Sequence, residues 1–214
     1  MGLFITVEGF DGCGKTSAIR ALSEKLKSKN GIEVEMFREP GGTSLGNTIR
    51  DILKTDTPNH KARLLLFEAS RAMICPIINR LVQDGKIVIC DRFTDSTIAY
   101  QSFGSSEPMS IVEGLNNYAT GILRKPDITF YLEADIKTEK SRVNNRGEHS
   151  PSDMESDWFH QRVRDGYHKL MKMDPDRFIL IDSNKPLNEV VDNMYSCIIE
   201  KIKYEKNVYK KSIV

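Results

Sequence analysis

The sequence lacks the segments that place a protein in or across a membrane. No hydrophobic run approaches the roughly 20 residues needed to span a bilayer, and the N-terminus has neither the basic region nor the apolar region of a signal peptide. The four cysteines form no C-x-x-C pair and do not cluster with the four histidines, so we interpret them as reduced thiols and not as metal ligands. These absences predict a soluble protein of the cytoplasm.

An excess of charge of one sign is also missing. The sequence has 31 lysines and arginines against 30 aspartates and glutamates, which gives a formal charge of +1 over 214 residues. A nucleic-acid polymer or an acidic membrane would favour a strongly basic chain, so neither is expected as a partner. Any recognition of phosphate must therefore depend on a local site.

Short β-branched and aromatic segments alternate with helical segments along the chain. This alternation is typical of an α/β fold in which helices cover both faces of a parallel sheet, here a doubly wound five-stranded sheet. The length suits a single domain over residues 1–214, with the lysine-rich segment 203–214 as a frayed end. The predicted strands are 3–8, 33–38, 86–91, 127–133 and 178–182, and the predicted helices are 16–29, 61–83, 110–122, 137–145, 156–173 and 187–203.

A complete phosphate-binding motif follows the first predicted strand and precedes the first predicted helix. Residues 9–16 read G-F-D-G-C-G-K-T, which matches the pattern G-x-x-x-x-G-K-[ST] of the P-loop. The glycines allow backbone N–H groups to point at phosphate oxygens, Lys15 would reach the β- and γ-phosphates, and the Thr16 hydroxyl would bind Mg²⁺. The predicted phosphate-binding residues are Gly9, Phe10, Asp11, Gly12, Cys13, Gly14, Lys15, Thr16 and Ser17.

The guanine-binding motif of regulatory GTPases is absent. Its pattern is N-K-x-D, and the nearest match, Asn184-Lys185-Pro186-Leu187, lacks the aspartate. The P-loop therefore favours an ATP-dependent enzyme over a nucleotide-dependent switch.

Two further pairs of residues have a spacing suited to a phosphorylated pyrimidine. Asp91 and Arg92 follow an apolar strand, so they emerge at the sheet edge beside the P-loop, where Asp91 can hold Mg²⁺ through water and Arg92 can clamp an acceptor phosphate. Phe67 and Arg71 lie four residues apart on a predicted helix and share a face. There the ring can stack on a pyrimidine and the guanidinium can donate to its carbonyl oxygen. The alternatives are an ion pair at the strand end and a phenylalanine in the core.

These motifs, taken in order and spacing, resemble the thymidylate kinases from Ile5 to about Met194. The resemblance implies a P-loop nucleotide kinase with a short lid that transfers the γ-phosphoryl group of ATP to dTMP, in dTTP synthesis, with Mg²⁺ and as a homodimer. The alternatives are a broad-specificity deoxynucleoside monophosphate kinase and a deoxynucleoside kinase, and a phosphate clamp argues against the latter. The matching segments are the P-loop with Asp11, 38–43 (R-E-P-G-G-T), Phe67 with Arg71, 91–93 (D-R-F), 96–101, and 162–164 (R-V-R).

The resemblance also assigns roles to individual residues. Glu39 and Arg50 would lie on the monophosphate side, and Thr97 and Tyr100 would line the sugar and base. The implied dTMP-binding residues are Asp11, Glu39, Arg50, Phe67, Arg71, Arg92, Thr97, Tyr100 and Gln101. The candidate catalytic residues are Lys15, Arg92, Arg146, Arg142 and Asp11, and the candidate Mg²⁺ ligands are Thr16 and Asp91.

One arginine that the resemblance implies is missing from the lid, at about residues 142–155. Because the variable positions of the P-loop carry no basic residue, the lid should supply the late positive charge that phosphoryl transfer needs. Many relatives read D-R-apolar-E there, whereas this chain has Ser-Asp-Met-Glu at 152–155. Either Arg146 acts alone, or Arg142 shares the role with Arg162 or Arg164.

Overall fold

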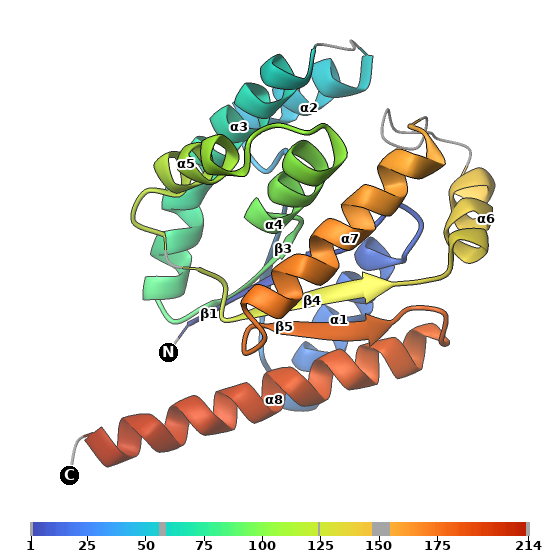
Figure 1. Cartoon of the computed structure of the whole chain (residues 1–214). Coiled ribbons are helices and arrows are strands. Elements are labelled where there is room, and N and C mark those ends of the chain that lie inside the picture. Colours follow the sequence, from blue (N-terminus) through green and yellow to red (C-terminus); the bar gives the residue numbers. More distant parts are fainter. Residues whose placement is uncertain (1, 56–58, 124, 147–154, 213–214) are drawn as a thin grey trace.

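A computed structural model describes residues 2–55, 59–123, 125–146 and 155–212 of the chain. Its centre is a parallel five-stranded sheet with the strand order β2-β3-β1-β4-β5 (Figure 1), which confirms the predicted fold class. Two strands have the predicted bounds, and three begin one residue later than predicted. The strands are β1 (Leu3–Glu8), β2 (Val34–Arg38), β3 (Ile87–Asp91), β4 (Ile128–Glu133) and β5 (Phe178–Asp182).

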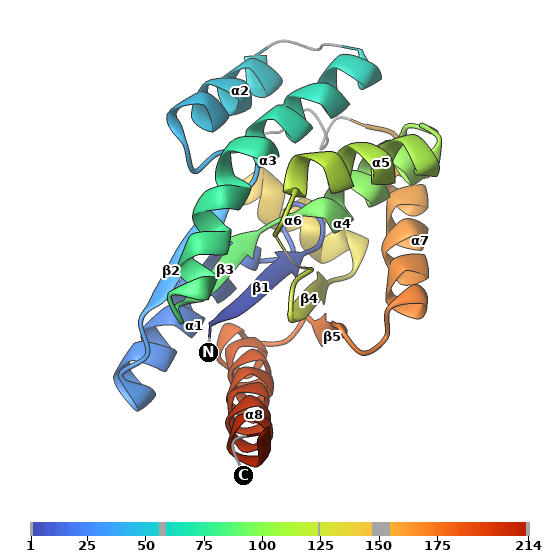
Figure 2. The ribbon, with the colours of Figure 1, turned by 90° about the vertical axis from the view of Figure 1, so that its left-hand side faces the viewer.

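Helices cover both faces of this sheet (Figures 1 and 2). α1 and α8 pack together on one face, and α3 and α7 contribute to the clusters on the other. The elements are α1 (Lys15–Asn30), α2 (Ser44–Thr55), α3 (His60–Gln83), α4 (Thr94–Thr97), the π-helix η1 (Ile98–Gly104), α5 (Met109–Thr120), α6 (Ile136–Arg146), α7 (Asp157–Met173) and α8 (Leu187–Ser212).

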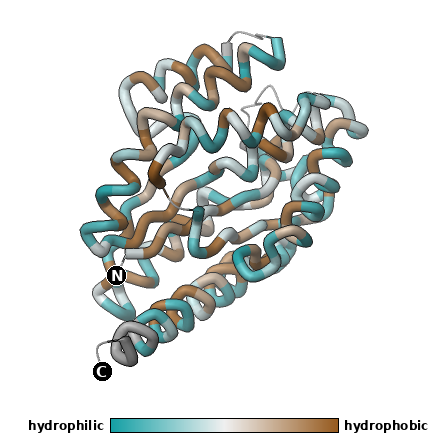
Figure 3. Tube along the Cα trace, turned by 60° about the vertical axis from the view of Figure 1, so that its left-hand side comes forward, coloured by the Kyte–Doolittle hydropathy of each residue, from teal (hydrophilic) through white to brown (hydrophobic). Residues whose placement is uncertain are grey.

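The hydrophobic core follows from the pattern of the strands. The segments β1, β3 and β4 are buried almost throughout, as expected when both faces of a parallel sheet are covered, and the hydrophobic residues concentrate along the sheet (Figure 3). Within the described residues, no helix is long and apolar enough to cross a membrane.

Register places the functional motifs at one edge of the sheet. Val7 at the end of β1 pairs with Asp91 at the end of β3, and Glu8 pairs with Tyr131 of β4. In parallel sheets the carboxyl ends of neighbouring strands meet at the same edge, where ligands bind. The P-loop and the segment after β3 therefore lie side by side.

The end of α8 and the segment after β3 differ from the predicted elements. α8 continues past the predicted end at Lys203 to Ser212, because lysine and glutamate are good helix formers and pair one turn apart, as Lys201 and Glu205 do at 3.5 Å. The segment after β3 forms α4 and then η1, where Ser105 N–H donates to the carbonyl of Tyr100, five residues earlier, at 2.9 Å. Hydrophobic periodicity does not reveal such a local π-turn.

Candidate active site

The loop between β1 and α1 needs its glycines for both conformation and space. Gly9, Gly12 and Gly14 have φ angles of 137°, 82° and 92°, which side chains disfavour. A Cβ atom at Gly9 would lie 2.3 Å from the carbonyl oxygen of Leu132, and one at Gly12 would lie 2.4 Å from that of Glu139. The loop therefore packs tightly against the β4 end and α6, and it leads into α1, whose first N–H groups attract anions.

Lys15 is buried at the base of this loop. Its Nζ donates to the carbonyl oxygens of Gly9 and Phe10 at 2.9 and 2.7 Å. The loop thus holds a positive charge in place, ready to act on phosphate oxygens. Cys13 Sγ also accepts from Lys15 Nζ at 3.7 Å; the Cys13 side chain is fully buried, and burial raises the pKa of its thiol.

Thr16 and Asp91 lie side by side at the start of α1 and the end of β3. The Thr16 hydroxyl donates to Asp91 Oδ2 at 3.1 Å, whereas Asp91 Oδ1 is buried and has no hydrogen-bond partner among the described residues. The described part of the chain contains no cluster of three histidine, cysteine or acidic residues suited to a metal. One carboxylate and one hydroxyl fit Mg²⁺, which binds few protein groups and takes its other ligands from phosphates and water.

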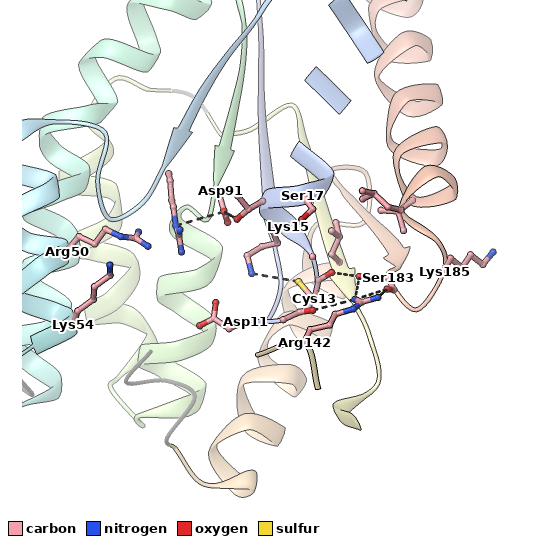
Figure 4. Close-up of a pocket in the computed structure, with 17 residues that line it drawn as sticks. Asp11, Cys13, Lys15, Ser17, Arg50, Lys54, Asp91, Arg142, Ser183 and Lys185 are labelled. Atoms are coloured by element: carbon pink, nitrogen blue, oxygen red, sulfur yellow. Dashed lines mark hydrogen bonds and ion pairs between the residues drawn. The ribbon is translucent and has the colours of Figure 1, made fainter. Parts of the chain in front are cut away.

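Two adjoining cavities open at this edge of the sheet. The first, of about 850 Å³, runs along the P-loop to Arg142, Ser183 and Lys185 (Figure 4). The second, of about 160 Å³, lies between α2, α3 and η1. Both cavities are lined by the same four side chains, which are Asp11, Arg38, Arg50 and Lys54. A group that moves from one cavity to the other would therefore pass three cations.

All nine predicted dTMP-binding residues line the second cavity. Phe67 is half-buried there and belongs to none of the three core clusters. Arg92 pairs with Asp11 of the P-loop at 3.0 Å, and not with its neighbour Asp91, and its guanidinium lies 5.2 Å from the ring centroid of Tyr100. The structure therefore brings the separate motifs to one pocket.

Arg71 is buried in a network of polar side chains at the wall of this cavity. It donates to Glu39 at 2.8 Å, to Glu68 and Asn116 at 2.6 Å, and to Thr97 at 2.9 Å. An Nη2–Glu39 ion pair at 2.7 Å engages the fifth N–H. The sequence predicts an arginine that donates to a base, whereas here each donor of the guanidinium meets a protein oxygen.

Unlike the predicted dTMP-binding residues, the candidate arginines of the lid and α7 do not lie together in one cavity. Arg142 lines the first cavity, where it donates to the carbonyl oxygens of Ser183 at 3.1 Å and Gly12 at 3.4 Å. Arg146 is the last residue of α6, and its side chain, like residues 147–154, lies outside the part of the chain that the structure describes. Arg162 lies over Trp158, and Arg164 pairs with Glu133 and Glu139; neither lines the two cavities.

Several lining residues were not predicted. Arg38 is the last residue of β2 and opens the R-E-P-G-G-T segment, so its position at the carboxyl end of a strand was a usable signal. Lys54 and Arg63 lie one helical turn from Arg50 and Phe67, which periodicity could have indicated. The lining residues without a predicted role include Arg38, Lys54, Arg63, Ser96, Ser183 and Lys185.

Known proteins match this chain along most of its length. A family model described as thymidylate kinase matches residues 7–194, a range that includes every residue lining the two cavities. A thymidylate kinase from Dehalococcoides mccartyi is 42% identical over 196 residues, covering 89% of this chain and 92% of that protein. One from Staphylococcus epidermidis is 39% identical over 208 residues, covering 95% and 100%. The crystal structure of thymidylate kinase from Ehrlichia chaffeensis has a TM-score of 0.75 at 34% identity and covers 92% of this chain and 98% of that one.

Proposed function

Because the chain belongs to the thymidylate kinase family, it transfers a phosphoryl group from ATP to dTMP, and we propose that its two adjoining cavities hold these two substrates. The observation that carries this proposal is the shared wall of Asp11, Arg38, Arg50 and Lys54. Phosphoryl transfer spreads negative charge over the transferring group, and cations fixed around its path stabilise the transition state.

The first cavity is the donor site in this proposal. Its size suits a nucleoside triphosphate, and residues of the P-loop line it. Lys15 would exchange its bonds to loop carbonyls for the β- and γ-phosphate oxygens. Arg142 and Ser183 would lie at the far end of the cavity, toward the base. The residues proposed to bind ATP phosphates remain Gly9, Phe10, Asp11, Gly12, Cys13, Gly14, Lys15, Thr16 and Ser17.

The second cavity is the acceptor site. Phe67 would stack on the thymine ring and Gln101 would bond its edge, since the Gln101 Oε1 atom is buried without a partner among the described residues. Tyr100 would crowd the C2′ position and disfavour a ribose. Arg38 and Arg92 would hold the dianionic phosphate, because two guanidinium groups at one cavity match its charge and geometry.

Catalysis would then come from position and charge, with no covalent intermediate. Thr16 and Asp91 would hold Mg²⁺, which neutralises charge on the β- and γ-phosphates when bound with the nucleotide. Arg92 and Asp11 fix the acceptor side, and Lys15 fixes the donor side. Arg146 remains the candidate for late positive charge from the lid.

An ADP-release assay with ATP and a panel of acceptors tests this assignment. We expect dTMP to be the best acceptor among dTMP, dUMP, dAMP, dGMP and thymidine. Arg38→Ala should raise the KM for dTMP by about tenfold or more, the loss of a charged hydrogen bond, and should raise the KM for ATP by less, although Arg38 lines both cavities. A better rate with dGMP, or an Arg38→Ala defect only in ATP binding, would contradict the proposed acceptor site.

We also propose that the protein is a homodimer, and that each chain is a single domain with a lid, in the cytoplasm. A homodimer is supported by apolar side chains exposed along α3, namely Leu65, Met73 and Ile77 at 57%, 48% and 42%. A light-scattering mass that stays dimeric in Met73→Glu would contradict this interface. Residues 1–214 as a single domain are supported by the single sheet that the described strands form. The proposed lid at 142–155 begins in the last turn of α6, and its residues 147–154 lie outside the described part of the chain. Four unpaired cysteines support a reducing, cytoplasmic compartment.

A further inference from the structure

Glu8 is a buried carboxylate at the junction of β1 and the P-loop. Its side chain is fully inaccessible to solvent, and it lines neither of the two cavities. Oε1 accepts from the backbone N–H of Phe93 at 2.8 Å. Oε2 accepts from the hydroxyls of Ser96 at 2.5 Å and Tyr167 at 3.1 Å. A buried carboxylate with this many donors is held in one orientation.

A chain of hydrogen bonds leads from Glu8 to the acceptor cavity. Ser96 donates its single proton to Glu8, and its oxygen accepts from Arg92 Nη1 at 3.1 Å. Arg92 then donates through Nη2 to Asp11 of the P-loop at 3.0 Å. The bond from Phe93 N–H to Glu8 holds the backbone next to Arg92, whose φ of 70° is uncommon for a residue with a side chain. Glu8 thus fixes both the backbone and the side chain of this arginine.

We propose that Glu8 is a positioning residue that acts through Ser96 to hold the Arg92 guanidinium in place for the phosphate of dTMP. This rests on the proposed role of Arg92 as the acceptor-phosphate clamp. Glu8 is covalently joined to Gly9 of the donor loop and hydrogen-bonded to the acceptor clamp. It therefore ties the two substrate sites to one another.

The charge of the carboxylate decides the direction of these bonds. An ionised Glu8 only accepts, so Ser96 must donate to it and present lone pairs to Arg92. An amide at this position keeps its oxygen toward Phe93 N–H and turns its NH₂ toward Ser96. The Ser96 hydroxyl then accepts from the amide, and its proton competes with the donors of Arg92. The guanidinium loses its acceptor although the shape of the side chain is retained.

A pH dependence should accompany this arrangement. Burial and the nearby Asp95 raise the pKa of Glu8 to about 7, against the opposing effects of Ser96 and Arg92. The other titratable or charged groups near Glu8 include the Tyr167 hydroxyl from α7, the buried Cys90 thiol from β3 and, behind Asp95, Arg177, which pairs with Asp95 at 2.6 Å. Glu8 is ionised above pH 7 and neutral below it, so the KM for dTMP should rise as the pH falls through 7. A phosphate monoester takes up its own proton near pH 6, and that dependence persists without Glu8.

The test is steady-state kinetics of Glu8→Gln, Ser96→Ala, the double variant and Arg92→Ala, with ATP and dTMP varied in turn. At pH 8, Glu8→Gln and Ser96→Ala should each raise the KM for dTMP by about tenfold and leave the KM for ATP within about twofold. The double variant should raise the KM for dTMP no further than either single variant, because both residues act on one chain of hydrogen bonds. Thr6→Val is the matched control. It removes a buried hydroxyl two residues before Glu8 on β1, which bonds to Thr129 at 2.8 Å and not to the Glu8–Ser96–Arg92 chain, so it should leave the KM for dTMP within about twofold.

The outcomes separate this inference from the proposed site. An unchanged KM for dTMP in Arg92→Ala overturns the clamp and the role of Glu8 with it. Two results would overturn the role of Glu8 alone, provided that Arg92→Ala raises the KM for dTMP strongly. One is that the effects of Glu8→Gln and Ser96→Ala add, and the other is that Glu8→Gln leaves this KM unchanged. If Glu8→Gln does not fold, Ser96→Ala decides the question, since loss of the rise in KM around pH 7 supports the inference and its persistence refutes it.

Discussion

Replacement of Arg71 by leucine should destabilise the protein by roughly 3–5 kcal/mol, the cost of breaking a buried ion pair by removing one partner. The side chain is 2% exposed and is the cation for both Glu39 and Glu68, at 2.7 and 2.6 Å. Each of these carboxylates already has one buried oxygen without a hydrogen-bond partner in the described chain. Leucine fills much of the volume of the arginine side chain, so the loss of stability reflects the missing charge more than lost packing.

The size of the loss should depend on pH in a defined direction. Without Arg71, the native state can keep Glu39 and Glu68 buried only by protonating them, whereas the unfolded chain leaves them ionised above a pKa of about 4.3. The native variant therefore binds more protons than the unfolded chain, and its stability falls as pH rises. In the native wild type burial already raises the pKa of Glu39 to about 7, against the opposing charge of Arg71. The deficit should therefore grow mainly above pH 7, by up to about 1.4 kcal/mol per pH unit for each carboxyl that holds a proton only in the variant.

Urea unfolding followed by circular dichroism, at one protein concentration and at pH 6, 7 and 8, measures this deficit. Arg80→Leu is the matched control, since Arg80 lies on the same helix with a side chain 85% exposed, and it should change stability by no more than about 0.5 kcal/mol. Adding Glu39→Gln and Glu68→Gln to Arg71→Leu should recover part of the loss and abolish its pH dependence. A deficit below about 1 kcal/mol, or one that is flat with pH, would refute the reasoning.

Four further predictions concern the reaction. Lys15→Ala should lower kcat by about a hundredfold or more, as losses of preorganised charge do, and leave the unfolding midpoint almost unchanged; near-normal turnover would contradict the P-loop role. Asp91→Asn should raise the Mg²⁺ concentration for half-maximal rate by about tenfold, since one carboxylate ligand is lost, without changing the KM for dTMP; an unchanged Mg²⁺ requirement would count against this ligand. Arg146→Ala should lower kcat and kcat/KM together by about a hundredfold while equilibrium ATP binding is retained. Arg142→Ala, which alters the wall of the donor cavity, should instead weaken ATP binding; the reverse pattern would exchange their roles.

The sequence was most informative where the structure is local. The P-loop could be predicted because Gly9, Gly12 and Gly14 are required by the backbone itself, and a short range of residues contains every signal. The five strands could be predicted because each is a short run rich in β-branched and aromatic residues, and β1, β3 and β4 are also buried almost throughout. The position of Asp91 and Arg92 followed from the rule that parallel strands end at the same edge.

Contacts between segments far apart in the sequence could not be predicted from such patterns. The sequence places Phe67 and Arg71 on one helix face, but it does not show that Glu39 and Asn116, 32 residues earlier and 45 residues later, meet the guanidinium. The role of Glu8 was missed for the same reason, since its partner Tyr167 lies 159 residues away. Polar networks of this kind depend on tertiary packing, which neither periodicity nor propensity encodes.

The π-helix η1 fixes the length of the chain at the wall of the second cavity. A π-turn contains one residue more than an α-turn, so a one-residue deletion within Ile98–Gly104 could restore an α-helix without loss of backbone bonds. Both ends of the segment are anchored, however, since Thr97 bonds to Arg71 and a Cβ atom at Gly104 would lie 2.6 Å from the ring of Phe159. Removing a residue would rotate Gln101 by about 100° relative to one anchor. In this segment a gap in the sequence is therefore a larger change than a substitution, and aligned relatives that differ here in length would have a differently shaped second cavity.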